Sequence, residues 1–74
     1  MPALPVVSGA EAVRRFERTG WSVVRRKGSH VMMTHPEVRA TLSIPQHREL
    51  DRGLLRALIR AAGMTVAEFG SLRA

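Results

Sequence analysis

The 74-residue sequence contains no cysteine. This absence excludes disulfide bridges and thiolate metal sites, and it fits a reducing compartment. The three histidines, His30, His35 and His47, lack a metal-ligand spacing such as H-x3-H on a helix face. We therefore expect no structural metal and no cofactor.

The sequence also lacks a long apolar run. Residues 1–7 have no basic leader and no apolar core long enough for a secretion signal. Arg56 and Arg60 interrupt the longest apolar stretches, which fall far short of the roughly 20 residues that a membrane span needs. Repeats, low-complexity tracts and linkers are absent too. We expect one small cytoplasmic domain, of marginal stability unless a partner adds burial.

What the sequence has in excess is positive charge. Twelve Lys and Arg face six Asp and Glu, which gives a net charge of +6 and a pI of about 11.8. All these cations except Lys27 are arginines, whose planar guanidinium suits phosphate. A field of this sign favours polyanions, so nucleic acid and an acidic protein are both candidate partners. Genome composition or solubility is the alternative explanation.

Capping patterns predict three helices. Ser8-Gly9-Ala10-Glu11 and Thr65-Val66-Ala67-Glu68 are typical capping boxes, and Asp51 is a good N-cap. Gly20 and Gly63 are expected to end the first two helices in the left-handed conformation. The apolar side chains expected in the core are Ala12, Val13 and Phe16, then Leu55, Leu58, Ile59 and Ala62, and Phe69 from the short last helix.

The helix arginines are expected to face away from the core. Those of the first helix are Arg14, Arg15 and Arg18. In the second helix, arginines four residues apart form a basic ridge. This ridge is interpreted as a solvated helix face, as an RNA contact or as a docking surface for an acidic partner; its members are Arg52, Arg56 and Arg60.

Between the two long helices, residues 21–25, 31–34 and 40–44 are rich in strand-favouring side chains. Trp21 and Val23 are expected to share the core face, while Met32 and Met33 are assigned to core or interface packing. In the third strand Ala40, Leu42 and Ile44 alternate with outward Thr41 and Ser43. Pro36 marks the second turn and Pro45 closes the sheet. The order helix, antiparallel three-stranded sheet, helix, short helical turn predicts an α+β fold with one sheet face open to solvent.

Lys27-Gly28-Ser29-His30 joins the first two strands and brings a cation, turn N–H groups and an imidazole together. With Ser8-Gly9, Gly20-Trp21, Ile44-Pro45-Gln46-His47, residues 54–59, Ala62-Gly63-Met64 and Glu68-Phe69, it makes the chain resemble the HicA-type toxins of bacterial toxin–antitoxin pairs. The ordered series is more specific than any single piece. The resemblance covers about residues 8–69, so residues 1–74 are expected to form one HicA-like domain.

The resemblance implies a fold similar to the double-stranded-RNA-binding domain, in agreement with the element order. It also implies an mRNA interferase, an endoribonuclease that cleaves mRNA without a metal and is held inactive by a HicB-type antitoxin. The family's active-site histidine falls on His30. Many members carry a polar residue, often a second histidine, directly after it, and this chain has Val31 there.

Metal-free cleavage of RNA uses the substrate's 2′-hydroxyl as nucleophile and needs a base, an acid and cations. Histidine serves either protonation role near neutrality. We therefore expect His30 to act as general acid or base, and the turn around it to contact phosphate. The expected RNA-binding residues are Arg25, Arg26, Lys27, Gly28 and Ser29.

The other histidines have more ordinary interpretations. His47 is a candidate for the second proton-transfer group, although a structural role in its loop is favoured. His35 precedes a proline in a turn and is expected to be solvated. Two other functions stay open: a non-catalytic RNA-binding module of the same fold, in which His30 contacts RNA without chemistry, and an interaction protein that is basic only to match an acidic partner.

Overall fold

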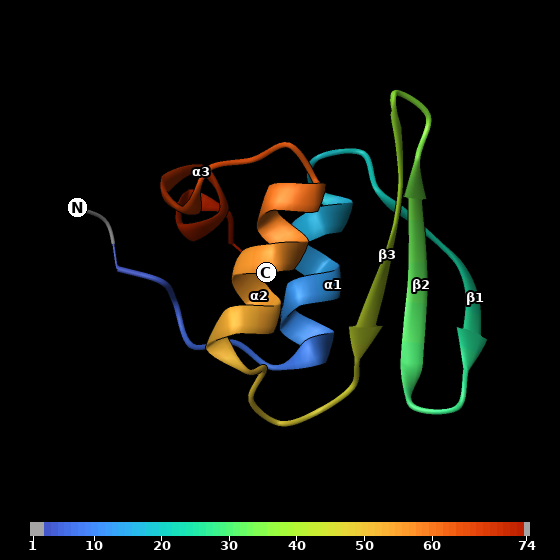
Figure 1. Ribbon diagram of the computed structural model, residues 1–74, viewed down its shortest axis with the longest axis horizontal. Helices are drawn as coiled ribbons and strands as arrows, with labels where there is room; N and C mark the ends of the chain where they lie inside the picture. The colour runs from blue at the N-terminus through green and yellow to red at the C-terminus, as the bar shows by residue number, and fades with distance from the viewer. Residues whose placement is uncertain (1–2, 74) are drawn as a thin grey trace.

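The computed structural model describes residues 3–73 and has the element order expected from the sequence (Figure 1). Helix α1 (Gly9–Glu17) precedes a three-stranded antiparallel sheet of β1 (Ser22–Lys27), β2 (His30–His35) and β3 (Val38–Pro45) in the order β1-β2-β3. Helices α2 (Arg52–Ala61) and α3 (Val66–Ser71) follow. The helices lie on one side of the sheet (Figure 1). The α+β prediction is confirmed.

The helices begin where the sequence predicts. The side chains of Ser8, Asp51 and Thr65 each accept a hydrogen bond from a backbone N–H in the first turn that follows. The capping box is reciprocal only in α3. At α1 the carboxylate of Glu11 pairs with Arg15 at 2.9 Å instead of returning to the backbone of Ser8, because the i,i+4 partner is a charged donor on the same helix face.

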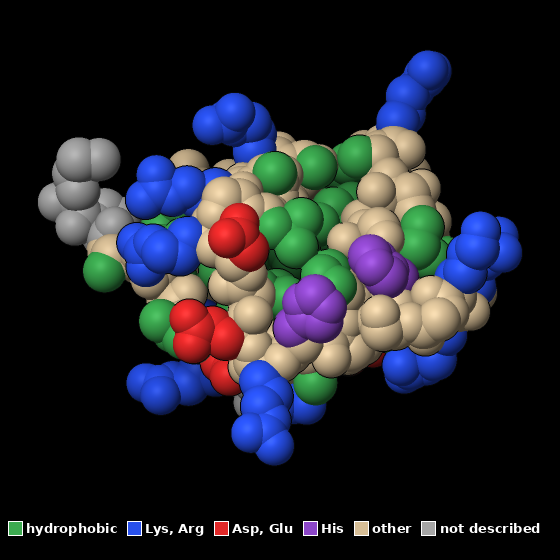
Figure 2. All heavy atoms as spheres, turned by 60° about the horizontal axis from the view of Figure 1, so that its bottom comes forward, with side chains coloured by type: hydrophobic (Ala, Val, Ile, Leu, Met, Phe, Trp, Pro, Cys, Tyr) green, Lys and Arg blue, Asp and Glu red, His purple; other side chains and the backbone are tan. Residues whose placement is uncertain are grey.

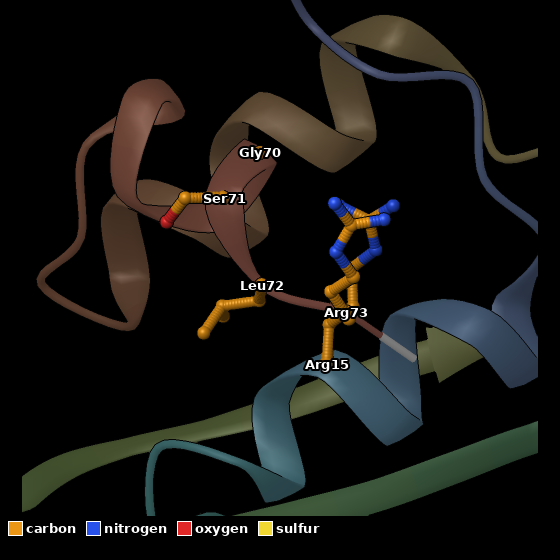
Figure 3. Close-up of a pocket in the computed structure, with 5 residues that line it drawn as sticks. All are labelled: Arg15, Gly70, Ser71, Leu72 and Arg73. Atoms are coloured by element: carbon orange, nitrogen blue, oxygen red, sulfur yellow. The ribbon is translucent and has the colours of Figure 1, made fainter.

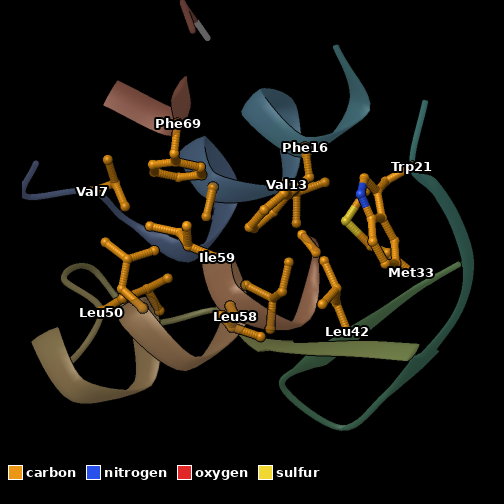
Figure 4. Packing of buried hydrophobic residues seen from close by; sticks show 14 of the residues in the cluster. Val7, Val13, Phe16, Trp21, Met33, Leu42, Leu50, Leu58, Ile59 and Phe69 are labelled. Carbon is orange, nitrogen blue, oxygen red and sulfur yellow. The ribbon is translucent and has the colours of Figure 1, made fainter. Parts of the chain in front are cut away.

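The core lies between the helices and the inner face of the sheet (Figure 4). Phe16 is at its centre, with ring centroids 5.1 Å from Phe69 and 6.3 Å from Trp21. The side chains expected to be buried from α1, α2 and α3 are buried. The N-terminal segment, for which the sequence predicted no role, adds Leu4 and Val7 to this core.

Arg15 is integrated into the helical layer, contrary to the expectation that it faces solvent. One guanidinium nitrogen donates to the carbonyl oxygen of Phe69 at 3.1 Å, another to Glu11, and the guanidinium carbon lies 5.4 Å from the Phe69 ring centroid. Figure 3 shows it beside a cavity of about 390 Å³ whose lining also includes Gly70, Ser71, Leu72 and Arg73. The arginine therefore fastens α3 to α1.

None of the helices between residues 3 and 73 is long and apolar enough to cross a membrane.

Candidate active site

A two-residue turn joins β1 to β2. Lys27 and His30 are cross-strand partners, so Gly28 and Ser29 alone form the turn. Gly28 has a φ of +60°, and a glycine with positive φ at the first central position is the arrangement of a type II′ hairpin turn. Within residues 3–73 no backbone hydrogen bond uses the N–H of Gly28 or of Ser29, which leaves both donors available to a ligand.

The register of the sheet assigns the side chains to its two faces. Val31, Met33, Leu42 and Ile44 are buried under the helices. The alternate positions therefore belong to the open face, since neighbouring strand residues point to opposite sides and cross-strand partners share a side. The open face near the turn thus carries Arg25, Lys27, His30, Met32 and Ser43.

The sheet is uniformly basic. Its three strands carry four Lys or Arg residues and neither Asp nor Glu. Two of these cations, Arg25 and Lys27, share the open face with His30 and are exposed. An anion approaching His30 therefore meets positive charge without a nearby carboxylate on the strands, which favours a phosphodiester electrostatically.

His30 is held in place by a serine of the next strand. Its Nδ1 lies 3.0 Å from the hydroxyl oxygen of Ser43, an exposed contact across β2 and β3. This bond restrains the imidazole and leaves Nε2 without a partner among the described residues. With Nδ1–H donating to Ser43, Nε2 presents a lone pair and can accept a proton; in the other tautomer Ser43 donates and Nε2 carries the proton. Ser43 thus supports either proton-transfer role.

The loop after β3 supports the turn from the other side. The N–H of Gln46 donates to the carbonyl oxygen of Ser29 at 2.7 Å, which continues the pairing of β2 and β3 by one step. The N–H of Gly9 donates to the carbonyl oxygen of His47 at 2.9 Å. The first turn of α1 therefore fixes this loop, and the loop fixes the turn.

Gly9 makes that support possible. A Cβ at this position would lie 2.2 Å from the carbonyl oxygen of Pro45 and 2.8 Å from the Cα of Gln46. Both are backbone atoms, so neither can rotate away. Ser8-Gly9 and Pro45-Gln46-His47 are thus the two sides of one contact.

Arg26 lies on the opposite face from His30. β1 contains a bulge: Val23 pairs with Met33, but Arg25 pairs with the next residue, Met32. Val24 is the extra residue and is 54% exposed. Beyond the bulge Arg26 pairs with buried Val31, which places it on the helix side of the sheet. The structure brings Arg25, Lys27, Gly28 and Ser29 together around His30 and separates Arg26 from them.

The other two histidines differ in environment. His35, expected to be solvated, is half-buried: its Nε2 lies 3.0 Å from the carbonyl oxygen of Thr19, and its Nδ1 accepts from the N–H of Glu37 at 3.0 Å. These partners fix the neutral Nε2–H tautomer, because a carbonyl only accepts and an amide N–H only donates. Its ring centroid is 5.4 Å from that of Trp21. His35 is a structural residue.

His47 is exposed, and the contact that the structure gives it is through its carbonyl oxygen. Figure 2 views the end of the molecule with the β1–β2 turn and the loop after β3, and histidine side chains are exposed there among Lys and Arg. No group of three or more His, Cys, Asp or Glu that could hold a metal ion occurs in residues 3–73.

Sequence reasoning did not assign Ser43 to the site. The alternation of residues 40–44 placed its side chain outward, but the contact with His30 depends on the register of β2 with β3, which no local pattern contains.

A family model described as HicA toxin of bacterial toxin-antitoxin matches residues 9–64. The matched stretch runs from the first residue of α1 past the end of α2, and it contains the sheet, the turn and His30. Helix α3 lies outside it. A search of curated proteins finds no match to the chain.

Proposed function

The chain belongs to the HicA toxin family of bacterial toxin–antitoxin systems, and from this premise we propose that it is an endoribonuclease that cleaves mRNA without a metal. Membership implies a cognate antitoxin partner; we propose that this partner is of the HicB type. The observation that carries the proposal is the placement of His30, an exposed imidazole on a basic sheet face with Nδ1 held by Ser43 and Nε2 free.

The proposed reaction is an internal transesterification. The 2′-hydroxyl attacks the adjacent phosphorus, the P–O5′ bond breaks, and a 2′,3′-cyclic phosphate and a free 5′-hydroxyl form. His30 acts through Nε2, either taking the proton of the 2′-hydroxyl or delivering one to the leaving 5′-oxygen. Water, which has open access to this face, completes the other transfer.

The residues around His30 bind and orient the phosphate. Lys27, directly opposite on β1, and Arg25 supply positive charge to the phosphorane, whose extra negative charge develops during the reaction. The free N–H groups of Gly28 and Ser29 provide neutral donors at the same turn. Val31, which follows His30, is buried. This chain therefore lacks the polar side chain that many family members carry directly after the active-site histidine.

The proposal is tested by substituting the histidine while keeping its bulk and polarity. His30→Gln is expected to lose cleavage of a purified mRNA while retaining its far-UV CD spectrum and its binding to the antitoxin. His47→Ala is expected to retain cleavage, because the described role of His47 is through its backbone. Cleavage by His30→Gln at the parent rate would contradict the role proposed for His30, whereas a folded parent protein that leaves the RNA intact would favour an RNA-binding module without catalysis.

A further inference from the structure

A groove runs between α1 and the helix side of the sheet, around the edge of β1 from His30. One wall is formed by residues of α1 that share a helix face, at positions 10, 13, 14 and 17. The other wall is formed by residues of β1, β2 and the loop after β3. The groove encloses about 220 Å³ and is lined by Ala10, Val13, Arg14, Glu17, Val23, Arg26, Val31 and Gln46.

Two exposed arginines from different elements meet in this groove. Arg14 comes from α1 and Arg26 from β1. Neither is in an ion pair, since the one pair found within residues 3–73 joins Glu11 and Arg15. Glu17 also lines the groove and lies beyond ion-pair distance of both. Two forked guanidinium groups against one carboxylate leave the groove with an excess positive charge, suited to an anion with several oxygens.

The β1 bulge is what puts a cation here. If Val24 were paired in a regular ladder instead of forming a bulge, the alternation would run unbroken from Val23, and Arg26 would exchange faces with Arg25 and Lys27. The bulge thus gives β1 cations on both faces: Arg25 and Lys27 beside His30, and Arg26 in the groove. Bulges that redirect a side chain are common next to functional sites.

The groove is also continuous with the His30 site. β1 is an edge strand, so within the described residues no further strand covers its outer side. Arg26 directly precedes Lys27, the cross-strand partner of His30. Gln46 lines the groove and its N–H binds the Ser29 carbonyl of the turn. A polyanion that crosses the edge of β1 therefore passes from one set of cations to the other.

We propose that the groove between Arg14 and Arg26 binds a second phosphate of the RNA, in the nucleotides that flank the cleaved bond. This inference rests on the proposed function, because it takes the occupant of the His30 face to be RNA. The continuity of the two sites favours RNA, whose phosphates recur at every nucleotide, over an acidic protein segment. Arg14 and Arg26 are binding residues here and take no part in the chemistry.

The test measures RNA binding by a protein that does not cleave. In a His30→Ala background, we compare Arg14→Ala and Arg26→Ala with Arg73→Ala, an exposed arginine beside the Arg15 cavity and outside this groove, using a 12-nucleotide single-stranded RNA. Arg14→Ala and Arg26→Ala are each expected to weaken binding about tenfold. Each is also expected to reduce the slope of log affinity against log salt by about 0.7, the value for one phosphate contact on a single strand. Arg73→Ala is expected to leave both quantities unchanged.

Two further arms identify the occupant. Glu17→Gln removes the one carboxylate of the groove and is expected to strengthen binding of the same RNA. A dinucleotide, too short to cross the edge of β1, is expected to bind the Arg14→Ala and parent proteins equally. An unchanged salt slope in Arg14→Ala and Arg26→Ala would overturn the groove assignment, as would loss of antitoxin binding without loss of RNA binding.

An incorrect groove assignment can be distinguished from an incorrect proposed function. If His30-dependent cleavage is observed while the groove variants bind RNA like the parent, the groove assignment alone is wrong. If the parent does not cleave RNA, the proposed function fails first.

Discussion

Gly9→Ala is expected to destabilise the protein although the substitution normally favours a helix. Gly9 is the first residue of α1 and is buried against the loop after β3. A methyl group there would meet the Pro45 carbonyl oxygen at 2.2 Å and the Cα of Gln46 at 2.8 Å. Relief requires α1 and the loop to separate, which also weakens the hydrogen bond from Gly9 to His47.

Whether Gly9→Ala stabilises or destabilises the protein depends on opposing contributions to the free energy of unfolding. Replacing glycine by alanine in a helix gains at most about 1 kcal/mol. Overpacking a tight contact costs about 1–3 kcal/mol, and the weakened hydrogen bond costs up to about 1.5 kcal/mol more. Together these contributions give a net loss of about 0–4.5 kcal/mol in the free energy of unfolding, with a central value of about 2 kcal/mol. For a domain of this size each 1 kcal/mol lowers Tm by about 4–8 °C.

The matched control is Gly70→Ala. Gly70 lies in α3, is exposed, and a Cβ there would meet nothing within 4 Å. This variant is expected to be as stable as the parent or more stable, by up to about 1 kcal/mol. Urea unfolding followed by far-UV CD measures both. A Gly9→Ala protein at least as stable as the parent would refute the close packing of α1 against the loop.

Three other substitutions test the core and the site. Ser43→Ala removes the hydrogen bond to Nδ1 of His30, which is worth about 0.5–1.5 kcal/mol. The kcat for RNA cleavage should therefore fall about 2- to 13-fold with little change in KM. Ser43→Thr should restore kcat, and Thr41→Ala on the same strand face should leave kcat unchanged. Phe69→Ala should cost about 3–5 kcal/mol in urea unfolding, since the ring is fully buried; a loss below 1 kcal/mol would contradict the packing of α3. Thr65→Ala removes the N-cap of α3 and should lower the free energy of unfolding by about 1 kcal/mol in the same assay. An unchanged free energy of unfolding would show that this cap contributes nothing to stability.

Local signals in the sequence were sufficient for the helices. Ser8, Asp51 and Thr65 accept the hydrogen bonds that their capping patterns predict, because capping depends on residues within one turn. Gly20 and Gly63 have the positive φ expected of them. These features need no knowledge of the tertiary structure.

The features that sequence reasoning missed all depend on pairing between distant segments. The bulge at Val24 separates Arg26 from Arg25, and it arises from the register of β1 with β2. The contact of Ser43 with His30 needs the register of β2 with β3. His35 is half-buried because the turn at Thr19 returns to it. The alternation of polar and apolar residues predicts which side chains of a strand share a face, but the register between strands decides which of these side chains are in contact.

The same limit applies to the N-terminal segment. Leu4 and Val7 have no periodic partners along the chain, so nothing local marked them as core residues. Val7 is positioned by its carbonyl oxygen, which accepts from the N–H of Leu50 at 2.9 Å. Both side chains are buried beside the helices.

The role of His30 is tested most directly by end-group analysis of RNA incubated in EDTA with the purified protein or with His30→Ala. We expect fragments with 2′,3′-cyclic phosphate or 3′-phosphate ends and free 5′-hydroxyls from the parent, and intact RNA from the variant. Fragments with 5′-phosphate ends, or equal cleavage by both proteins, would contradict 2′-hydroxyl attack assisted by His30.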